Sequence, residues 1–320
     1  MDLSVMAFFI GLDLGGTNLK YALGDEDGKL IVKKKKPSRA KEKSDLILDN
    51  LVESVNELKS QQKTEIKAVG IGSPGCIDFE HGQIIGVAAN LPEWSNAPIK
   101  NKLEEKINIP VFVDNDANLM ALAEARLGAA KNYKNVVCLT IGTGIGGAII
   151  VDGNLYRGAT YSAAEIGHMS IEFNGRKCRC GNRGCLELYT AAPAMVERYV
   201  HKLKKNGLFY ESQEISTKSI FEKARVHEDL AIETINEVCD YLGAGIANIL
   251  NLVNPEIVVI GGGVANAGEV FIKRIASATK ERALNANARK VKIVKAELGN
   301  DAGVIGSILL AAENSNQIRV

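Results

Sequence analysis

The sequence has no long apolar run and almost no net charge. Its 320 residues include 39 Lys and Arg against 38 Asp and Glu, which gives a formal net charge of +1 at pH 7. Bulk attraction to nucleic acid or to an anionic membrane requires a clear positive excess. No segment approaches the roughly 18 apolar residues that a membrane-spanning helix needs. We therefore expect neither a nucleic-acid partner nor a membrane partner.

The features of a secreted protein are also missing. The apolar stretch at residues 7–12 is short and runs directly into a glycine turn, unlike a signal peptide. Six cysteines in a chain of this length, without such a leader, do not indicate a disulfide framework. We expect a cytoplasmic protein, and its length favours two domains.

Two familiar nucleotide-binding fingerprints are absent, although the 31 glycines cluster in short groups. The segment Asp13-Leu14-Gly15-Gly16-Thr17-Asn18 precedes a predicted strand, whereas a Rossmann fingerprint precedes a helix. The second cluster, residues 140–147, has the sequence Thr-Ile-Gly-Thr-Gly-Ile-Gly-Gly, and no Gly-Lys-Ser/Thr of a Walker loop follows it. Each segment alone is explained by a hairpin turn. Adjacent glycines also let backbone N–H groups close on a phosphate.

The two glycine turns occupy equivalent places in a repeated layout of strand, glycine turn, strand, Asp/Gly turn and strand. The strands predicted from apolar runs are 8–13, 19–23, 30–34, 68–72 and 111–113, then 136–141, 146–151, 256–260 and 291–295. Helices are predicted at 44–60, 117–127, 231–252 and 301–312. The repeat suggests two α/β halves that face each other across a cleft. We expect a small α/β domain from 1–116 plus 301–320, and a large one from 117–300.

One acidic residue lies where a predicted strand meets a predicted helix, in Asp114-Asn115-Asp116-Ala117-Asn118. Asp116 is a natural N-cap, which is a structural role. The helix N-terminus would also keep its carboxylate ionised at the domain junction. An ionised carboxylate accepts the proton of an attacking hydroxyl, and such general-base help is worth about 100- to 10,000-fold in rate.

A cluster of metal-ligand residue types follows in the second half. His168 precedes Cys178, Cys180 and Cys185, and three thiolates with one imidazole complete a tetrahedral zinc site. With no open coordination position, such a site is structural rather than catalytic. We place a zinc loop at 168–187. The other cysteines, Cys76, Cys138 and Cys239, lie in apolar surroundings and are predicted to be small core residues.

These motifs together resemble the ROK family of sugar kinases, named after repressors, open reading frames and kinases. The resemblance extends from the first glycine turn to Asp301-Ala302-Gly303-Val304-Ile305-Gly306. Its most specific stretch is Glu165-Ile166-Gly167-His168 with Cys178-Arg179-Cys180-Gly181-Asn182-Arg183-Gly184-Cys185-Leu186-Glu187. It implies an actin-like (ribonuclease H-like) ATPase fold, with two α/β domains around a closing cleft and Asp116 as the base.

The resemblance also implies the binding sets. Sugar contacts are expected from Gly75, Asn90, Asn115, Asp116, Glu165, His168 and Glu187. His168 would bind zinc through one ring nitrogen and the sugar through the other. ATP and its phosphates are expected at Asp13, Gly15, Gly16, Thr17, Asn18, Lys20, Thr140, Gly142, Thr143, Gly144, Gly146, Gly147, Gly262 and Gly263. Asp13 would hold Mg²⁺ through water. A homodimer or homotetramer is expected as well.

The sequence thus predicts an ATP-dependent kinase acting on the 6-hydroxyl of a hexose, with glucose as the leading substrate. A kinase for N-acetylmannosamine or N-acetylglucosamine would share this motif set. Fructokinases of the family usually vary the metal ligands, which disfavours fructose. A sugar-responsive transcriptional repressor would need an N-terminal helix-turn-helix, for which a strand starting near residue 8 leaves no room. A non-catalytic, zinc-bound interaction module is the last alternative.

Overall fold

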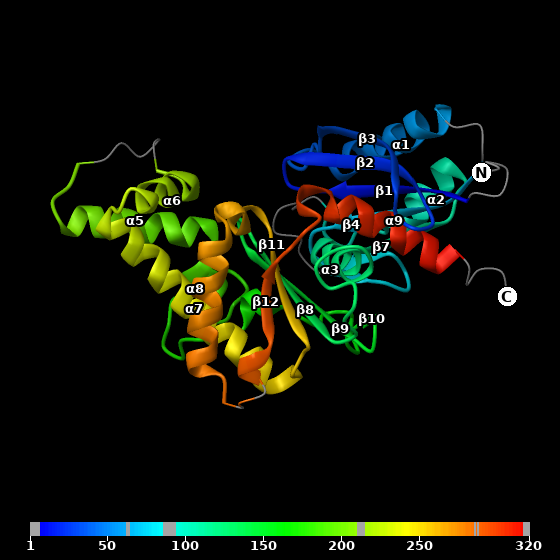
Figure 1. Ribbon diagram of the computed structural model, residues 1–320. Coiled ribbons are helices and arrows are strands. Elements are labelled where there is room, and N and C mark those ends of the chain that lie inside the picture. Colours follow the sequence, from blue (N-terminus) through cyan, green and yellow to red (C-terminus); the bar gives the residue numbers. More distant parts are fainter. Residues whose placement is uncertain are drawn as a thin grey trace. The chain divides into compact units, whose positions relative to one another are not determined.

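Figure 1 shows the fold as a computed structural model, which describes residues 7–61, 65–85, 94–209, 215–284, 286 and 288–315. The chain divides into two compact α/β units. Unit 1 contains the described residues of Met1–Leu127, Arg157–Ala163 and Asn300–Val320, and unit 2 contains those of Gly128–Tyr156 and Ala164–Gly299. Among the described helices, none is both long enough and apolar enough to cross a membrane.

Unit 1 is built on a five-stranded sheet with the strand order β3-β2-β1-β4-β7. The strands are β1 (Phe8–Leu14), β2 (Asn18–Asp25), β3 (Leu30–Pro37), β4 (Ile66–Ser73) and β7 (Val111–Asn115). Strand β2 runs antiparallel to both β1 and β3, whereas β4 runs parallel to β1 and to β7. All five were predicted from the apolar runs, and each extends further than predicted. A short hairpin, β5 (Cys76–Asp78) and β6 (Gln83–Ile85), follows β4.

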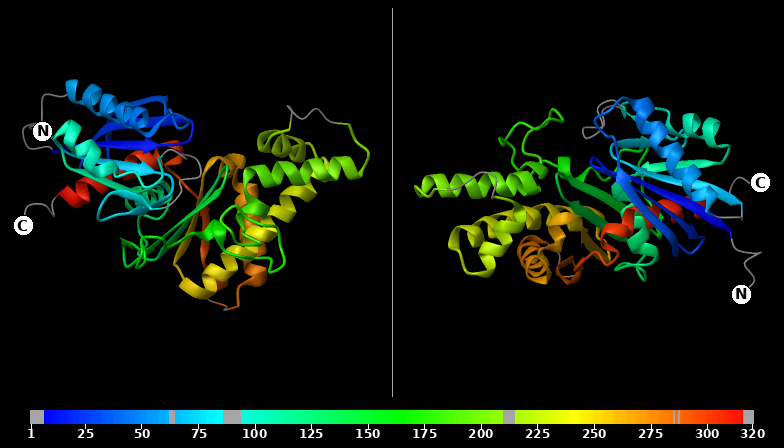
Figure 2. Two further views of the ribbon diagram at one scale, coloured as in Figure 1. Left: turned by 180° about the vertical axis from the view of Figure 1, so that it is seen from behind. Right: turned by 90° about the horizontal axis from the view of Figure 1, so that it is seen from above.

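Helices cover both faces of this sheet, because its central strands are apolar on both faces. On β1, Ile10 and Leu12 belong to the core shared with α1 (Ser44–Ser60) and α2 (Ile99–Ile107). Phe9 belongs to the opposite core, formed with α9 (Ala302–Ser315). Figure 2 shows α9 on the other side of the sheet from α1.

The close packing of α9 depends on small residues and corrects the expected domain boundary. A Cβ on Gly70 of β4 would lie 1.8 Å from the Ser307 carbonyl oxygen of α9, so the helix approaches the strand only because this residue is glycine. Helix α3 (Asp116–Arg126) packs on α9 as well, and a Cβ on Gly306 would lie 2.0 Å from the Leu119 carbonyl oxygen.

Because α3 packs on α9, unit 1 extends to Leu127, instead of ending at 116 as the sequence suggested. It also includes Arg157–Ala163, which the expected division placed in the second domain.

Unit 2 repeats the sheet of unit 1, strand for strand. Its order is β10-β9-β8-β11-β12, with β8 (Val136–Ile141), β9 (Ile145–Val151), β10 (Asn154–Leu155), β11 (Ile257–Gly261) and β12 (Lys292–Lys295). Strand β9 runs antiparallel to both β10 and β8, whereas β11 runs parallel to β8 and to β12, as β4 does to β1 and β7. The repeated layout read from the sequence is thus confirmed in the sheet topology.

The helices of unit 2 are α4 (Glu187–Thr190), α5 (Ala192–Lys205), α6 (Thr217–Arg225), α7 (Asp229–Val253) and α8 (Glu269–Arg282). Helix α7 shares one core with β8 and β11 through residues such as Leu242 and Ile246. It ends at Asn254, whose φ of 48° is left-handed, immediately before Pro255. The predicted stop at this pair is confirmed.

Candidate functional site

The first glycine turn joins β1 to β2 in unit 1 and places Asp13 beside two positive groups. Antiparallel pairing sets Asp13 opposite Lys20, whose Nζ donates to Asp13 Oδ2 at 3.0 Å and to the Asn300 carbonyl oxygen at 2.8 Å. A Cβ on Gly303, in the first turn of α9, would lie 2.7 Å from the Asp13 carboxyl. The carboxylate therefore lies between a lysine and a helix N-terminus, two features that attract a negative charge. No pattern in the sequence indicated that α9 reaches this turn.

The turn itself uses one of its donors internally. The Gly15 N–H donates to the Asn18 carbonyl oxygen at 3.0 Å, and the Thr17 carbonyl oxygen accepts from the Ser38 N–H at 3.0 Å. Gly16 and Thr17 lie exposed at the tip. Of the predicted phosphate contacts in this turn, these two are the most accessible.

The second glycine turn joins β8 to β9 in unit 2, and two of its glycines make room for protein rather than for a ligand. A Cβ on Gly144 would lie 2.4 Å from Glu187 Oε2, and a Cβ on Gly147 would lie 2.4 Å from the Ala164 carbonyl oxygen. Glu187 Oε2 also accepts from the Ile145 N–H at 2.9 Å. Thr143 lies exposed at the tip, and Gly142 is half-buried with open space on its Cβ side. This turn is therefore built together with Glu187.

Asn115, not Asp116, caps helix α3. The Asn115 side-chain oxygen accepts from the backbone N–H groups of Ala117 at 2.8 Å and Asn118 at 3.3 Å. The Asn115 amide nitrogen donates to the Gly75 carbonyl oxygen at 2.9 Å, which brings two predicted sugar contacts together. Asp116 is the first helical residue, and it is exposed. Capping, the structural alternative for Asp116, is thus the role of its neighbour Asn115. The Asp116 carboxylate lies at the helix entrance, where its Oδ1 accepts from the Ala117 N–H at 2.9 Å.

A second aspartate lies beneath this cap. The Asp114 side chain is 2% exposed, and its Oδ2 accepts from Arg157 Nε at 2.8 Å and from Nη2 at 2.6 Å. Its Oδ1 accepts from the Asn115 N–H at 2.7 Å and from the Asn118 side-chain amide at 2.8 Å. Asp114 is therefore a satisfied buried anion, and it is not a candidate base. The sequence placed neither Asp114 nor Arg157 in the site.

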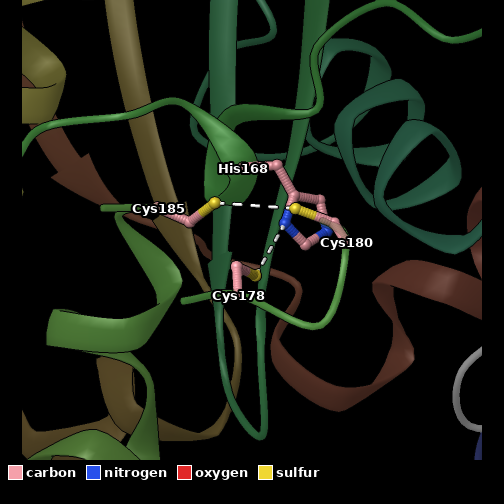
Figure 3. A group of neighbouring side chains, drawn as sticks. All are labelled: His168, Cys178, Cys180 and Cys185. Carbon is pink, nitrogen blue, oxygen red and sulfur yellow. Dashed lines mark hydrogen bonds between the residues drawn. The ribbon is translucent and has the colours of Figure 1, made fainter. Parts of the chain in front are cut away.

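The four predicted metal ligands converge in unit 2 (Figure 3). One ligand atom each from His168, Cys178, Cys180 and Cys185 lies within 4.8 Å of every other. His168 Nδ1 is 3.8 Å from Cys178 Sγ, and Cys180 Sγ is 3.6 Å from Cys185 Sγ. Ligands of a tetrahedral zinc ion with Zn–S bonds of about 2.3 Å stand about 3.8 Å apart. The donor set and its spacing thus fit a closed zinc site.

The loop that carries these ligands is shaped by tight turns. The Gly181 N–H donates to the Cys178 carbonyl oxygen at 3.1 Å, and the Cys178 N–H donates to the Asn182 carbonyl oxygen at 2.8 Å. Gly181 and Gly184 have positive φ values of 95° and 71°, which glycine adopts without strain. A Cβ on Gly184 would lie 1.9 Å from the Glu172 carbonyl oxygen. This geometry is possible only with these glycines.

The thiols of the cluster differ in their pKa values. The pKa of Cys180 is lowered, chiefly by a hydrogen bond from the Asn182 backbone N–H. Burial raises the pKa of Cys185 to about 12. Cys185 is fully buried, so its thiolate is stable only beside a positive partner such as a metal ion.

The remaining predicted sugar contacts of unit 2 lie close to this loop in sequence and structure. His168 ends a short 3₁₀ helix, η2 (Ile166–His168), and turns Nδ1 towards the thiols, which leaves Nε2 for another partner. Glu165 precedes η2 and is exposed. Glu187 begins α4 two residues after Cys185, and its Oε1 is 3.4 Å from Arg179 Nη2. Asn90 lies outside the described residues.

A cavity of about 330 Å³ lies beside a third glycine cluster, residues 261–263, also in unit 2. One wall is α6, with Thr217, Phe221 and Arg225. The other is η4 (Gly263–Ala267), which follows β11 directly. Gly262 before it has a φ of 86°, and a Cβ there would lie 2.5 Å from the Ile141 carbonyl oxygen. The volume lies in the range of small-ligand sites.

The predicted site residues therefore fall into two groups. Gly75, Asn115 and Asp116 lie in unit 1 with the first glycine turn and Lys20. Glu165, His168 and Glu187 lie in unit 2 with the second glycine turn, the metal-ligand cluster and the cavity at Gly263.

Comparison with known proteins places this arrangement in a family. The sequence profile of the ROK family matches residues 9–314. A glucokinase from Halalkalibacterium halodurans is 36% identical over 97% of each chain. A xylose repressor from Caldicellulosiruptor bescii is 33% identical, over 94% of this chain and 77% of its own length. A ROK family glucokinase from Streptomyces griseus, solved with glucose and AMPPNP, is 31% identical, with a TM-score of 0.83 over 96% of this chain and all of its own. This chain belongs to the ROK family and has the actin-like (ribonuclease H-like) fold that its sequence predicted.

Proposed function

We propose that this chain is an ATP-dependent hexose kinase that converts glucose to glucose 6-phosphate. The observation that carries the proposal is the exposed Asp116 carboxylate at the start of α3, beside the capping Asn115, in a chain of this family. Relatives named glucokinase match nearly the whole chain, and one solved relative holds both glucose and an ATP analogue.

Asp116 acts as the general base in this proposal. Its carboxylate accepts the proton of the glucose 6-hydroxyl while that oxygen forms a bond to the γ-phosphorus of ATP, and ADP leaves. The positive end of α3 keeps the carboxylate ionised before the transfer. Products are glucose 6-phosphate and ADP, with one proton released.

The other groups have binding roles. The exposed tips of the two glycine turns and Lys20 would hold the phosphates, and Mg²⁺, bound through water to Asp13, would neutralise their charge. The adenosine would bind in the cavity between α6 and Gly263, whose volume suits a small ligand. Gly75, Asn90, Asn115, Glu165, His168 and Glu187 would bind sugar hydroxyls, because amides and carboxylates pair with vicinal hydroxyls.

Zinc at His168, Cys178, Cys180 and Cys185 would be structural. It would fix the His168 ring and the start of α4, and so would orient Glu187 without taking part in the reaction. Thiolate ligands and an ATP substrate both fit the reducing cytoplasm, where we expect the protein to act. The homodimer or homotetramer stays a prediction.

A coupled ADP-release assay over five sugars tests the proposed substrate. Glucose should give the highest kcat/KM among glucose, mannose, fructose, N-acetylglucosamine and N-acetylmannosamine. One substituent that the pocket does not accommodate typically lowers kcat/KM by about 10- to 200-fold. A higher kcat/KM for an acetylated hexosamine would overturn glucose as the substrate but keep the kinase. No sugar-dependent ADP release with any of the five would overturn the kinase.

Gly144→Ala tests the link between the second glycine turn and Glu187. The new methyl would displace the Glu187 carboxylate, which lies 2.4 Å from the Cβ position, and would break its bond to the Ile145 N–H. We expect the glucose KM to rise about 10- to 100-fold, the worth of one hydrogen bond to a charged group, with little change in the unfolding midpoint.

Glu187→Ala supplies the control for this prediction. Without the carboxylate the methyl has nothing to displace, so adding Gly144→Ala to Glu187→Ala should change KM no further. An additive loss in the double variant would mean that Gly144 acts by another route, such as direct contact with phosphate.

A further inference from the structure

We propose that Arg157 is a positioning residue for the base, acting through Asp114. This inference rests on the proposed role of Asp116. Arg157 does not need to touch a substrate for this purpose, because it holds the buried anion on which the start of α3 is built.

The ion pair between Arg157 and Asp114 is buried and well formed. Two guanidinium nitrogens, Nε and Nη2, donate to the single oxygen Oδ2 at 2.8 and 2.6 Å. The Asp114 side chain is 2% exposed and that of Arg157 is 20% exposed. The guanidinium carbon also lies 3.8 Å from the ring centre of Phe79, a cation–π contact that fixes its plane. A buried carboxylate stays charged only with such a partner.

The other Asp114 oxygen connects this pair to the base. Oδ1 accepts the backbone N–H of Asn115 and the side-chain amide of Asn118. Asn115 in turn caps α3 and donates to the Gly75 carbonyl oxygen, and Asp116 is the next residue. Two consecutive contacts, each shorter than 3 Å, therefore connect Arg157 to the backbone of Asn115, the residue that directly precedes the base.

The segment that supplies Arg157 is itself held against unit 1. It comprises Arg157–Ala163, and the chain on both sides of it belongs to unit 2. Tyr161 donates its hydroxyl to Glu80 Oε2 at 3.2 Å, and Cys76 Sγ lies 2.9 Å from Ser162 Oγ and 3.3 Å from the Tyr161 carbonyl oxygen. The segment is thus attached to the β5–β6 hairpin at several points. Such attachment would be unnecessary if it only linked two strands or loops of unit 2.

Loss of Arg157 should therefore reduce turnover more than binding. The Asp114 anion would be left unpaired, and it would either take up a proton or rotate towards water. Both outcomes weaken the acceptor that orients Asn115 and Asp116. A misplacement of about 1 Å in a catalytic group costs up to about 100-fold in rate. The nucleotide cavity lies in unit 2 and shares no residue with this pair.

The test compares Arg157→Met, Arg157→Lys, Asp114→Asn and the double variant Asp114→Asn/Arg157→Met. We expect Arg157→Met to lower kcat about 10- to 100-fold while the ATP KM stays within about 2-fold of wild type. Arg157→Lys should have a higher kcat than Arg157→Met, because lysine restores the positive charge although it lacks the paired guanidinium donors. The double variant should be no slower than Arg157→Met, since it leaves no unpaired charge. Guanidinium ion added to an Arg157→Ala variant should restore part of kcat.

Arg126→Met is the matched control. Arg126 is also an arginine in an ion pair at α3, with Glu313 at 2.7 Å, but it lies at the far end of the helix. Its replacement should leave kcat unchanged.

Three results would overturn the positioning role: an Arg157→Met variant with wild-type kcat, a kcat loss that matches only the unfolded fraction, or strictly additive losses in the double variant. If Arg157→Met fails to fold, the Arg157→Lys variant, the double variant and guanidinium rescue still decide whether Arg157 positions the base. A fully active Asp116→Asn variant would instead overturn the base, and with it the proposed mechanism.

Discussion

Replacing Asp116 with Asn should lower kcat by about 100- to 10,000-fold and leave glucose affinity within a few-fold of wild type. The amide is close in size to the carboxylate and still forms hydrogen bonds, but it does not take up the proton of the 6-hydroxyl. Asn115 keeps its cap, so the start of α3 should stay in place. Steady-state ADP release gives kcat, and isothermal titration with glucose gives the affinity.

Asp229→Asn is the control for Asp116→Asn. Asp229 is likewise an exposed aspartate at the first position of a helix, α7, directly after a capping side chain, here that of Glu228. Both substitutions remove the same favourable charge from a helix N-terminus, at about 0.3 to 1 kcal/mol. Only the Asp116 variant should lose turnover. Turnover near the wild-type level in Asp116→Asn would eliminate Asp116 as the base.

The second large effect is expected at Cys185. Cys185→Ala should reduce bound zinc from about one ion per chain to none, because three ligands hold the ion far less tightly than four. Loss of a structural metal belongs to the few single-site changes that cost more than about 4 kcal/mol. Glu187 follows two residues later, so kcat/KM for glucose should fall about 10- to 100-fold as well.

Metal analysis by atomic emission and a denaturant unfolding curve measure these changes. Cys239→Ala is the matched control, because Cys239 is also fully buried in unit 2 but lies outside the metal-ligand cluster. It should retain zinc and lose about 1 kcal/mol of unfolding free energy. Acidification should also release zinc from the wild type, since protons compete for the thiolates and the imidazole. Wild-type protein that is metal-free yet fully stable and active would contradict the zinc assignment.

Most residues of the candidate site could be named from the sequence because they are close together in the chain. The glycine turns, the Asn115-Asp116 pair and the Cys-x-Cys loop are local patterns with local causes. The repeated strand layout likewise depends only on apolar runs and turn residues, and the two sheets confirm it.

The contacts that position this chemistry were not predictable in the same way. Arg157 lies 43 positions from Asp114, and no periodicity or motif connects them. Asn115 and Asp116 are both good capping residues, so only the backbone geometry decides which one caps α3. The glycines of the second turn predicted a phosphate loop. In the structure, a side chain at position 144 would collide with Glu187, and one at position 147 with the Ala164 backbone. The domain boundary was wrong because α3 packs on a helix from the far end of the chain.

The position of α9 has a consequence for synthesis of the protein on the ribosome. The strands of unit 1 come from the first 115 residues, but Phe9, Ala22 and Ala68 on one face are covered by Val304 and Ile308 of α9. A nascent chain therefore exposes an apolar sheet face while all of unit 2 is being made. Unit 2 contains every strand of its own sheet within one stretch that is broken only by Arg157–Ala163, and it can become compact first. Chaperone binding during translation should accordingly concentrate on the uncovered face of unit 1 until residues 302–315 emerge.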